Sequence, residues 1–464
     1  MQEPLSHFLD HCFYWVWGPL PLLLFAIGLF LTYQLRFLQF THLPAALRII
    51  LGKDQEHKAQ GDVTHFQSLM TALAATLGIG NIAGVATAIT VGGFGAIVWM
   101  WVVAGIGMAI KYGEALLAVK FRKLDRRGEM CGGPMYFIGE QLKWKKLAGS
   151  FALFGLAASF GGGNILQANS VADVLESSWA IDPMVSGIVL ACFVGVSLIG
   201  GIQSIGRVAS ILVPMMALLY VGAALVILAL SYDQIPSLLS HMVHSAFSGE
   251  AAIGGFAGAS ILQVIQIGAS RGMMTSEAGL GTASIAAAAA KTDEPCRQGL
   301  VSMTGAFLST GVMCTITALV IGVGGLFGIE DSRGGILTGA TLTSRSFELF
   351  LPGGAWIVAI SLVLFAFTTL IGWAYYGEKC IEYLWGEGAI FWYRLFFVLA
   401  IVPGAILQLE LVWKLSDIAN GLMAFPNLLG LVALSSVIVA DTRRYLHNEQ
   451  RLAAGLLQTA SEPK

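Results

Sequence analysis

Long apolar segments recur along the whole chain, and they constrain its fold more than any other feature of the sequence. A bilayer core about 30 Å thick is crossed by a helix of about 20 apolar residues. The windows of this kind fall near residues 13–35, 67–90, 94–119, 150–175, 184–200, 208–231, 251–270, 299–326, 354–384, 390–408 and 412–440. The spacing predicts an all-α membrane protein with about eleven transmembrane helices.

The composition supports a membrane location for these windows. Only 12% of the 464 residues are charged and 56% are hydrophobic, whereas soluble domains carry about 25% charged residues. A membrane β-barrel would show short alternating segments instead, and open strand edges leave backbone groups unpaired in lipid. Because no Pro-rich or Ser-rich linker separates the windows, we expect residues 1–464 to form a single transmembrane domain.

Lysine and arginine are unevenly distributed among the connecting segments. The segments after the first and third windows contain Arg36, Arg48, Lys53, Lys58, Lys120, Arg122, Lys123, Arg126, Arg127, Lys143, Lys145 and Lys146. Segments 1–12, 177–183 and 232–250 contain no lysine or arginine, and they fall on the opposite side if each window crosses once. Because basic loops stay in the cytoplasm, we expect an extracellular N-terminus and a cytoplasmic tail, 441–464. The predicted location is the plasma membrane, the inner membrane of a bacterium.

Several function classes lack any signal in the sequence. The net charge of -2 provides no basic field for binding nucleic acid. The six cysteines form no CxxC pair and no metal-ligand spacing with the eight histidines. No HExxH or Walker motif is present, and no histidine lies with a nucleophile in an apolar window. We therefore expect neither an enzyme nor a nucleic-acid-binding protein, and the sequence leaves the oligomeric state open.

Glycines interrupt two windows in a way that a plain membrane anchor does not require. The second window contains Gly78-Ile79-Gly80-Asn81-Ile82-Ala83-Gly84, and the seventh passes into the glycine-bearing segment 268–281. Both segments are predicted to contain non-helical backbone, which survives at membrane depth only where protein or a water-filled cavity satisfies its polar groups. Transporters bind anions and cations at such half-helix ends. The alternative is that these glycines serve only close helix packing.

The two interruptions occupy equivalent places in the order of windows. After an extra N-terminal helix, 13–40, each lies in the first window of a run of five, 67–231 and 251–440. Five crossings place the two runs in opposite orientations, which is the pattern of inverted-topology repeats. The sequence therefore predicts a transporter core built from two inverted five-helix repeats.

Amide side chains cluster in the fourth window, within Gly161-Gly162-Gly163-Asn164-Ile165-Leu166-Gln167-Ala168-Asn169-Ser170. Amides are costly in lipid unless they face a partner. Asn164 and Gln167 are three residues apart, so a regular helix places them on one face, where they could contact a bound solute. The alternative is that they hold neighbouring helices together through hydrogen bonds.

A pair of threonines in the ninth window offers oxygen ligands. We interpret the hydroxyls of Thr368 and Thr369, with backbone carbonyls between Ala74 and Gly78 that include Leu77, as a sodium site. Trp373 lies one helical turn after Thr369 and could form a wall of an apolar pocket. The alternative is that both hydroxyls bond to carbonyls of the preceding turn in their own helix.

Charged residues within or beside the windows leave other mechanisms open. Lys111 and Glu114 are three residues apart and can neutralise each other on one helix face. Arg271 and Glu277 fall in the second interrupted segment and could form part of a cytoplasmic gate. Glu277 or Glu114 could also relay protons, which leaves a proton-coupled carrier as an alternative to sodium coupling. A channel is the remaining alternative.

Several long motifs together resemble the alanine or glycine:cation symporter family. They are Gly78-Ile79-Gly80-Asn81-Ile82-Ala83-Gly84-Val85-Ala86-Thr87-Ala88-Ile89, Trp99-Met100-Trp101, Lys111-Tyr112-Gly113-Glu114-Ala115, Gly132-Gly133-Pro134-Met135-Tyr136, Gln167-Ala168-Asn169-Ser170, Arg271-Gly272, Ser276-Glu277-Ala278-Gly279 and Gly372-Trp373-Ala374-Tyr375-Tyr376-Gly377-Glu378-Lys379-Cys380. The resemblance covers roughly residues 15–445 in the same order. It implies a LeuT-type fold and sodium-driven uptake of alanine or glycine.

The resemblance also implies roles for individual residues. Gly78, Gly80 and Asn81 are expected to contact the substrate or the ion, and Gln167 the amino acid. Thr369 and Trp373 would line the pocket, while Met273 and Met274 would limit the size of the substrate side chain.

The chain departs from the family pattern in ways that concern substrate preference. Ile79 stands where Thr or Val is expected, Phe94 replaces a proline, Ser284 and Ile285 replace an Ala-Pro-like step, and Met273-Met274-Thr275-Ser276 replaces Leu-Phe-Ser-Asn. We expect sodium to bind first, at Thr368 and Thr369, and the amino acid to follow near Asn81 and Gln167.

Overall fold

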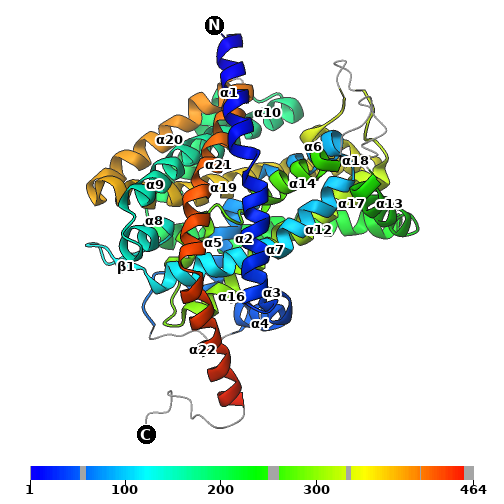
Figure 1. Ribbon diagram of the computed structural model, residues 1–464. Helices are drawn as coiled ribbons and strands as arrows, with labels where there is room; N and C mark the ends of the chain where they lie inside the picture. The colour runs from blue at the N-terminus through cyan, green and yellow to red at the C-terminus, as the bar shows by residue number, and fades with distance from the viewer. Residues whose placement is uncertain (1, 53–58, 249–260, 331–335, 408, 454–464) are drawn as a thin grey trace.

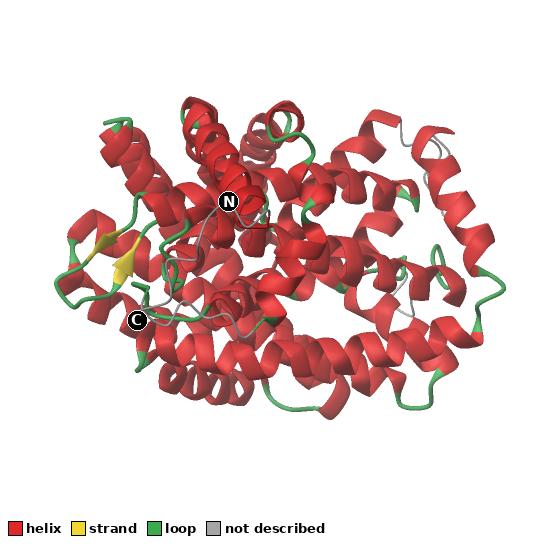
Figure 2. Cartoon of the chain, turned by 90° about the horizontal axis from the view of Figure 1, so that it is seen from below, coloured by secondary structure: helices red, strands yellow, loops and turns green. Residues whose placement is uncertain are grey.

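The computed structural model describes residues 2–52, 59–248, 261–330, 336–407 and 409–453. Within these ranges the regular structure is helical apart from one antiparallel hairpin of β1 (Lys123–Leu124) and β2 (Met130–Cys131) and two isolated bridges. Figure 2 shows this hairpin at the edge of the helical bundle. The predicted all-α class is confirmed.

The helices differ widely in length. In chain order they are α1 (Gln2–Trp17), α2 (Leu20–Gln34), α3 (Leu38–Thr41), α4 (Leu43–Leu51), α5 (His65–Thr76), α6 (Ala83–Gly92), α7 (Gly95–Lys120), α8 (Pro134–Tyr136), α9 (Lys145–Phe160), α10 (Leu166–Trp179), α11 (Pro183–Leu198), α12 (Gly201–Leu230), α13 (Ile235–Ser248), α14 (Ile261–Ser276), α15 (Thr282–Ala288), α16 (Pro295–Ala306), α17 (Thr315–Gly324), α18 (Gly339–Phe350), α19 (Gly354–Trp385), α20 (Ile390–Ile406), α21 (Leu409–Ala433) and α22 (Ser435–Ala453). The 3₁₀ segments are η1 (Ile79–Asn81) and η5 (Glu387–Ala389), and the π-helical segments are η2 (Phe137–Gln141), η3 (Gly161–Ile165) and η4 (Phe307–Cys314).

Eight helical stretches within the described residues are long and apolar enough to cross a membrane, so the chain is a multi-pass membrane protein. Two further apolar helices, α6 and α11, are shorter. Three of the eleven predicted windows are not among these eight stretches. Window 67–90 is divided between α5 and α6, window 184–200 corresponds to the shorter α11, and the first ten residues of 251–270 lie outside the described residues. The predicted number of crossings is therefore not confirmed. Of the predicted tail, 441–453 continue α22, and 454–464 lie outside the described residues.

The centre of the bundle is formed by α7 and α19. The most apolar part of α7 is 89% buried, and this helix packs against α14, α15 and α16. The second central helix, α19, packs against α5, α9, α10 and α12. At the periphery, α1 and α2 run beside α21 (Figure 1), where Trp17 Nε1 donates a 2.9 Å hydrogen bond to the Asp417 carbonyl. The interrupted helices therefore contact the centre of the molecule.

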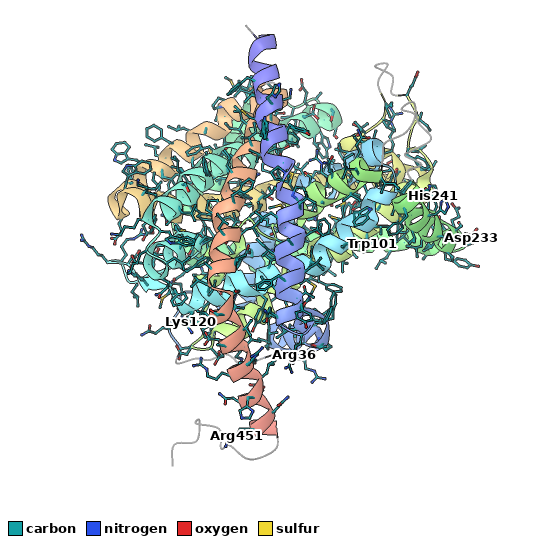
Figure 3. All side chains as sticks on the ribbon, in the orientation of Figure 1. Arg36, Trp101, Lys120, Asp233, His241 and Arg451 are labelled. Atoms are coloured by element: carbon teal, nitrogen blue, oxygen red, sulfur yellow. The ribbon has the colours of Figure 1, made fainter. Side chains whose placement is uncertain are left out.

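One end of the molecule is joined by polar contacts from distant segments. The Arg122 guanidinium donates hydrogen bonds of 2.7–2.9 Å to backbone carbonyls of Gln60, Ala288, Ala290 and Thr292. Its contacts connect the segment before α5 with the segment after α15. In Figure 3, Arg36, Lys120 and Arg451 lie toward this lower end, whereas Asp233 and His241 lie at the right of the molecule.

A second buried network ties α19 to the hairpin at the same end. Lys379 Nζ is fully buried and lies 2.9 Å from Glu382 Oε2 and 3.2 Å from Glu129 Oε2. Burial raises the pKa of the Cys131 thiol to about 12, so the thiol stays protonated and donates to Glu382 Oε1 at 3.0 Å. Lys379 Nζ thus lies beside the side chains of Asp125, Cys131 and Glu382, 4.0 Å from Asp125 Oδ2 and 3.4 Å from Cys131 Sγ.

Candidate solute-binding site

A small cavity lies where the interrupted helices meet α10, α19 and α21. Its volume is about 90 Å³, which exceeds the roughly 10–15 Å³ needed for one water molecule. Its lining residues come from five parts of the chain: Ala75, Thr76, Gly78, Ile79, Gly80, Gly84, Gly162, Leu166, Gln167, Arg271, Met274, Thr275, Glu277, Leu280, Thr369, Trp373, Ser416 and Asn420. The cavity therefore brings together the predicted residues Gly78, Gly80, Gln167, Thr369 and Trp373.

The first interruption unwinds the chain beside this cavity, as predicted. Helix α5 begins with a capping box between Thr64 and Gln67 and ends at Thr76. Gly78 is extended, with φ -123° and ψ -162°, and α6 begins only at Ala83. The Asn81 side chain stabilises the turn between them, because its Oδ1 accepts a 3.1 Å hydrogen bond from the Gly78 N–H. The last carbonyls of α5 and the first N–H groups of α6 are thus left without partners in their own helices.

Three oxygen atoms converge at the end of α5. The Thr369 hydroxyl donates a 3.2 Å hydrogen bond to the Ala74 carbonyl oxygen, and its Oγ1 lies 3.5 Å from the carbonyl oxygen of Leu77. Such spacings suit neighbouring ligands of a hard cation whose oxygens lie about 2.3–2.6 Å away, the range for calcium, an ion of similar radius to sodium. A Cβ atom at Gly78 would lie 2.9 Å from Thr369 Oγ1, so glycine permits this close approach.

Thr368 does not join these oxygens. Its hydroxyl donates to the Phe365 carbonyl at 3.0 Å, within its own helix, and lies 3.7 Å from Met216 Sδ on α12. Consecutive residues of a helix point about 100° apart. For Thr368 the structure therefore shows the back-bonded arrangement, whereas Thr369 faces the interruption.

Gln167 presents an unpartnered oxygen atom at the cavity. Its Nε2 donates a 3.0 Å hydrogen bond to the Gly162 carbonyl, which belongs to the π-helical segment η3. Because a carbonyl oxygen can only accept a hydrogen bond, the amide nitrogen of Gln167 must face it, and the amide oxygen therefore faces the cavity. Gln167 Oε1 is buried without a hydrogen-bond partner and can accept a hydrogen bond from a solute.

Two glycines of η3 allow α10 to approach the other cavity walls. A Cβ atom at Gly163 would overlap the Trp373 side chain, and one at Gly162 would overlap Ser416 Oγ. These two positions therefore require a hydrogen atom in place of a side chain. They set the distance between η3, α19 and α21.

Three predicted residues do not line the cavity. Asn81 Nδ2 donates to Ser309 Oγ at 3.0 Å, and Asn164 Nδ2 donates to the Phe397 carbonyl at 2.6 Å. Asn164 and Gln167 have different partners because Asn164 lies within the wider π-helical segment η3 and Gln167 lies in α10, where the regular helical register resumes. Met273 is fully buried within α14, whereas its neighbour Met274 faces the cavity.

The second interruption is shorter than the segment 268–281 predicted for it. Helix α14 continues to Ser276, and the non-helical residues are 277–281, among which Glu277, Gly279 and Gly281 have φ values of 53°, 86° and 77°. Gly268 is helical, and a Cβ atom there would lie 2.6 Å from Trp99 Cβ on α7. The glycines early in the segment thus serve close packing, and those at its end permit left-handed backbone.

Ser416 and Asn420 of α21 line the cavity but were not predicted. They are four residues apart and so share a helix face. The sequence feature that could have identified them is a pair of polar residues at this spacing within an apolar window. Asn420 Oδ1 is also buried without a hydrogen-bond partner.

Comparison with known proteins places this geometry in context. Residues 2–457 match the sequence profile of the sodium:alanine symporter family. The sodium/alanine symporter AgcS of Methanococcus maripaludis is 51% identical over 438 residues, which cover 93% of this chain and 95% of AgcS. An uncharacterised transporter of Haemophilus influenzae is 46% identical over 434 residues, covering 93% and 94% of the two chains.

A solved structure shares the fold at low sequence identity. MhsT, in complex with L-phenylalanine, superposes with a TM-score of 0.62 and 14% identity, covering 83% of this chain and 93% of MhsT. At this identity the likeness concerns the fold alone. It confirms the predicted LeuT-type architecture.

Proposed function

The chain belongs to the sodium:alanine symporter family, and on that premise we propose that it couples sodium entry to uptake of a small neutral amino acid, alanine or glycine. As members of this family are transporters, the chain is not an enzyme. The observation that carries the proposal is the convergence of Thr369 Oγ1 with the carbonyls of Ala74 and Leu77 beside a cavity of about 90 Å³.

In this proposal sodium, a co-transported ion, binds among the oxygens of Ala74, Leu77 and Thr369. The carbonyl end of a helix carries partial negative charge, so the end of α5 attracts a cation. Helix α5 contributes the carbonyls, and α19 contributes the hydroxyl. Sodium binding would therefore hold α5 against α19 and order the backbone around Gly78.

The amino acid is proposed to bind on the other side of the same interruption. Free N–H groups and the positive end of α6 attract a carboxylate. Gln167 Oε1, which lacks a partner, can accept a hydrogen bond from the substrate ammonium group. Trp373, Ile79 and Met274 line the cavity with apolar surface, and together with the small volume they favour a short aliphatic side chain.

The direction of transport follows from a proposed membrane orientation. Arg36, Lys120 and Arg451 lie toward one end of the molecule (Figure 3), and basic residues favour the cytoplasmic side. We therefore assign the N-terminus to the outside and α22 to the cytoplasm of a bacterial inner membrane. We also propose that residues 13–40 form an extra N-terminal helix and that residues 67–231 and 251–440 form two inverted repeats.

Transport into liposomes tests the proposed function. Purified protein in vesicles with an inward sodium gradient is expected to accumulate labelled alanine or glycine, whereas an equal potassium gradient gives none. Accumulation driven by a proton gradient without sodium would favour the proton-coupled carrier. Non-saturable flux of the amino acid without coupling would favour a channel.

Replacing Gln167 with alanine is expected to reduce amino-acid affinity by about 2- to 12-fold, the effect of losing a hydrogen bond worth about 0.5–1.5 kcal/mol. The sodium dependence of uptake measured at saturating amino acid should change little, because Gln167 is not among the converging oxygens. The matched control is Gln203→Ala, since Gln203 is exposed on α12. Equal affinities in the Gln167 variant and the wild type would remove this residue from the site.

A further inference from the structure

Side chains of α7 and α21 form hydrogen bonds with the backbone of the second interruption. Lys111 Nζ donates a 2.7 Å hydrogen bond to the Ser276 carbonyl at the end of α14. Glu114 Oε1 accepts from the Gly279 N–H at 3.1 Å and from Asn427 Nδ2 at 2.6 Å. The cation thus lies at the carbonyl end of α14 and the anion lies before the start of α15, which is the arrangement that helix dipoles favour.

Glu277 is the acidic residue of this cluster that reaches the cavity. It is 2% exposed and lines the cavity wall. Its Oε2 accepts a 3.0 Å hydrogen bond from Thr282 Oγ1, and its carboxyl group also interacts with the Thr76 and Trp373 side chains. The φ of 53° at Glu277 is unfavourable for a residue with a Cβ atom, and such strain is retained mainly at functional sites.

The charges around the cavity are unequal. Lys111 interacts with both Glu114 and Glu277, so one ammonium group is shared by two carboxyl groups. The other charged residue that lines the cavity, Arg271, interacts with Asp417 on α21. Two basic side chains, Lys111 and Arg271, thus face three carboxyl groups, and Glu277 is the carboxyl group among them that lines the cavity.

We propose that Glu277 is the counter-charge for the substrate ammonium group and thereby restricts transport to solutes that carry one. This inference rests on the proposed function and specifies the chemistry of its substrate. Burying a carboxylate that is not fully paired with a cation costs free energy in an apolar environment. The ammonium group of an entering substrate would pair with Glu277 and reduce that cost. Glu277 therefore selects zwitterionic amino acids over carboxylates of the same shape.

Paired ligands test this selectivity in the wild-type protein. Alanine and L-lactate differ chiefly in the ammonium group, which is a hydroxyl in lactate. Calorimetric titration in sodium chloride is expected to give an alanine affinity at least 100-fold higher than that of lactate. Lactate binding within about threefold of alanine would overturn the inference without affecting sodium coupling. If no standard amino acid binds, the proposed function fails instead.

The variant Glu277→Gln identifies the residue responsible. It keeps the shape and an acceptor for Thr282 but removes the charge, so alanine affinity is expected to fall by about 10- to 100-fold while lactate affinity changes little. The control Glu176→Gln alters an exposed residue of α10 and should leave both affinities unchanged. Should the glutamine variant not fold, Glu277→Asp retains the charge and should retain the preference for alanine over lactate. Loss of that preference in the aspartate variant would contradict the proposal.

Two other outcomes would also overturn it. If Glu277 instead holds sodium, Glu277→Gln will weaken sodium binding measured by thermal stabilisation in the absence of amino acid. If Glu277 instead carries a proton, the variant will keep its alanine affinity and lose the pH dependence of uptake. The expected result is unchanged sodium stabilisation together with reduced alanine affinity.

Discussion

Replacing Thr369 with valine is expected to raise the sodium concentration for half-maximal uptake by about 10- to 100-fold, because an oxygen in contact with a charge is worth about 1.5–3 kcal/mol. Valine has nearly the shape of threonine, so the packing of α19 against α5 is preserved. What is lost is the oxygen that lies 3.2 Å from the Ala74 carbonyl. The measurement is the sodium dependence of alanine uptake into liposomes at constant membrane potential.

The neighbouring threonine provides a matched control. Thr368 is equally buried, but its hydroxyl bonds within its own helix, so Thr368→Val should leave the sodium dependence near that of the wild type. The contrast separates ion binding from a general effect of losing a buried hydroxyl. Equal shifts in the two variants, or a larger shift at Thr368, would remove Thr369 from the proposed sodium site.

Replacing Gly163 with alanine is expected to reduce alanine uptake at least tenfold and to lower thermal stability. The added Cβ would overlap the Trp373 side chain, and overpacking of this kind costs about 1–3 kcal/mol. Relief requires movement of η3 or α19, and both form walls of the cavity. Uptake and the melting temperature of the purified protein would be measured together.

Gly149 of α9 is the control for this second substitution. A Cβ atom there meets no other atom within 4 Å, and alanine favours helix more than glycine by about 1 kcal/mol. Gly149→Ala should therefore transport normally and unfold at an unchanged or slightly higher temperature. Normal uptake by the Gly163 variant would show that the close contact between η3 and Trp373 is not needed for transport.

The parts of the fold that could be predicted are those that the lipid bilayer requires. A bilayer demands long apolar helices, and it tolerates interruptions only where other protein groups compensate them. The unwinding at Gly78 follows from these requirements, as does the second break near Gly279. The number of crossings is not confirmed in the same way, because the apolar window 67–90 is divided between two short helices, α5 and α6.

Side-chain direction was predictable only where the helix is regular. Thr369 and Trp373 are one turn apart in α19, and both reach the cavity. Asn164 and Gln167 do not share a face, because the π turn η3 alters the angle between them. Such a turn widens the helix by one residue without a distinctive sequence pattern. The sequence therefore could not show that only Gln167 faces the cavity while Asn164 bonds to the Phe397 carbonyl of a neighbouring helix, the alternative given for both amides.

The two interruptions differ in what completes them. At the second one, α7 supplies both Lys111 and Glu114, and these charges are a permanent part of the chain. At the first one, the oxygens of Ala74, Leu77 and Thr369 converge without a cationic side chain among the hydrogen-bond partners described for them. This asymmetry leads us to expect ion binding at the first interruption and a fixed geometry at the second.

The linkage between sodium and amino acid tests this view most directly. Alanine affinity would be measured calorimetrically in sodium chloride and in choline chloride, and sodium affinity with and without alanine. Because coupling between two sites is reciprocal, sodium should raise alanine affinity by the same factor by which alanine raises sodium affinity. Thr369→Val should reduce both factors equally. An alanine affinity that is identical in sodium and choline would contradict sodium binding beside the amino acid at the first interruption.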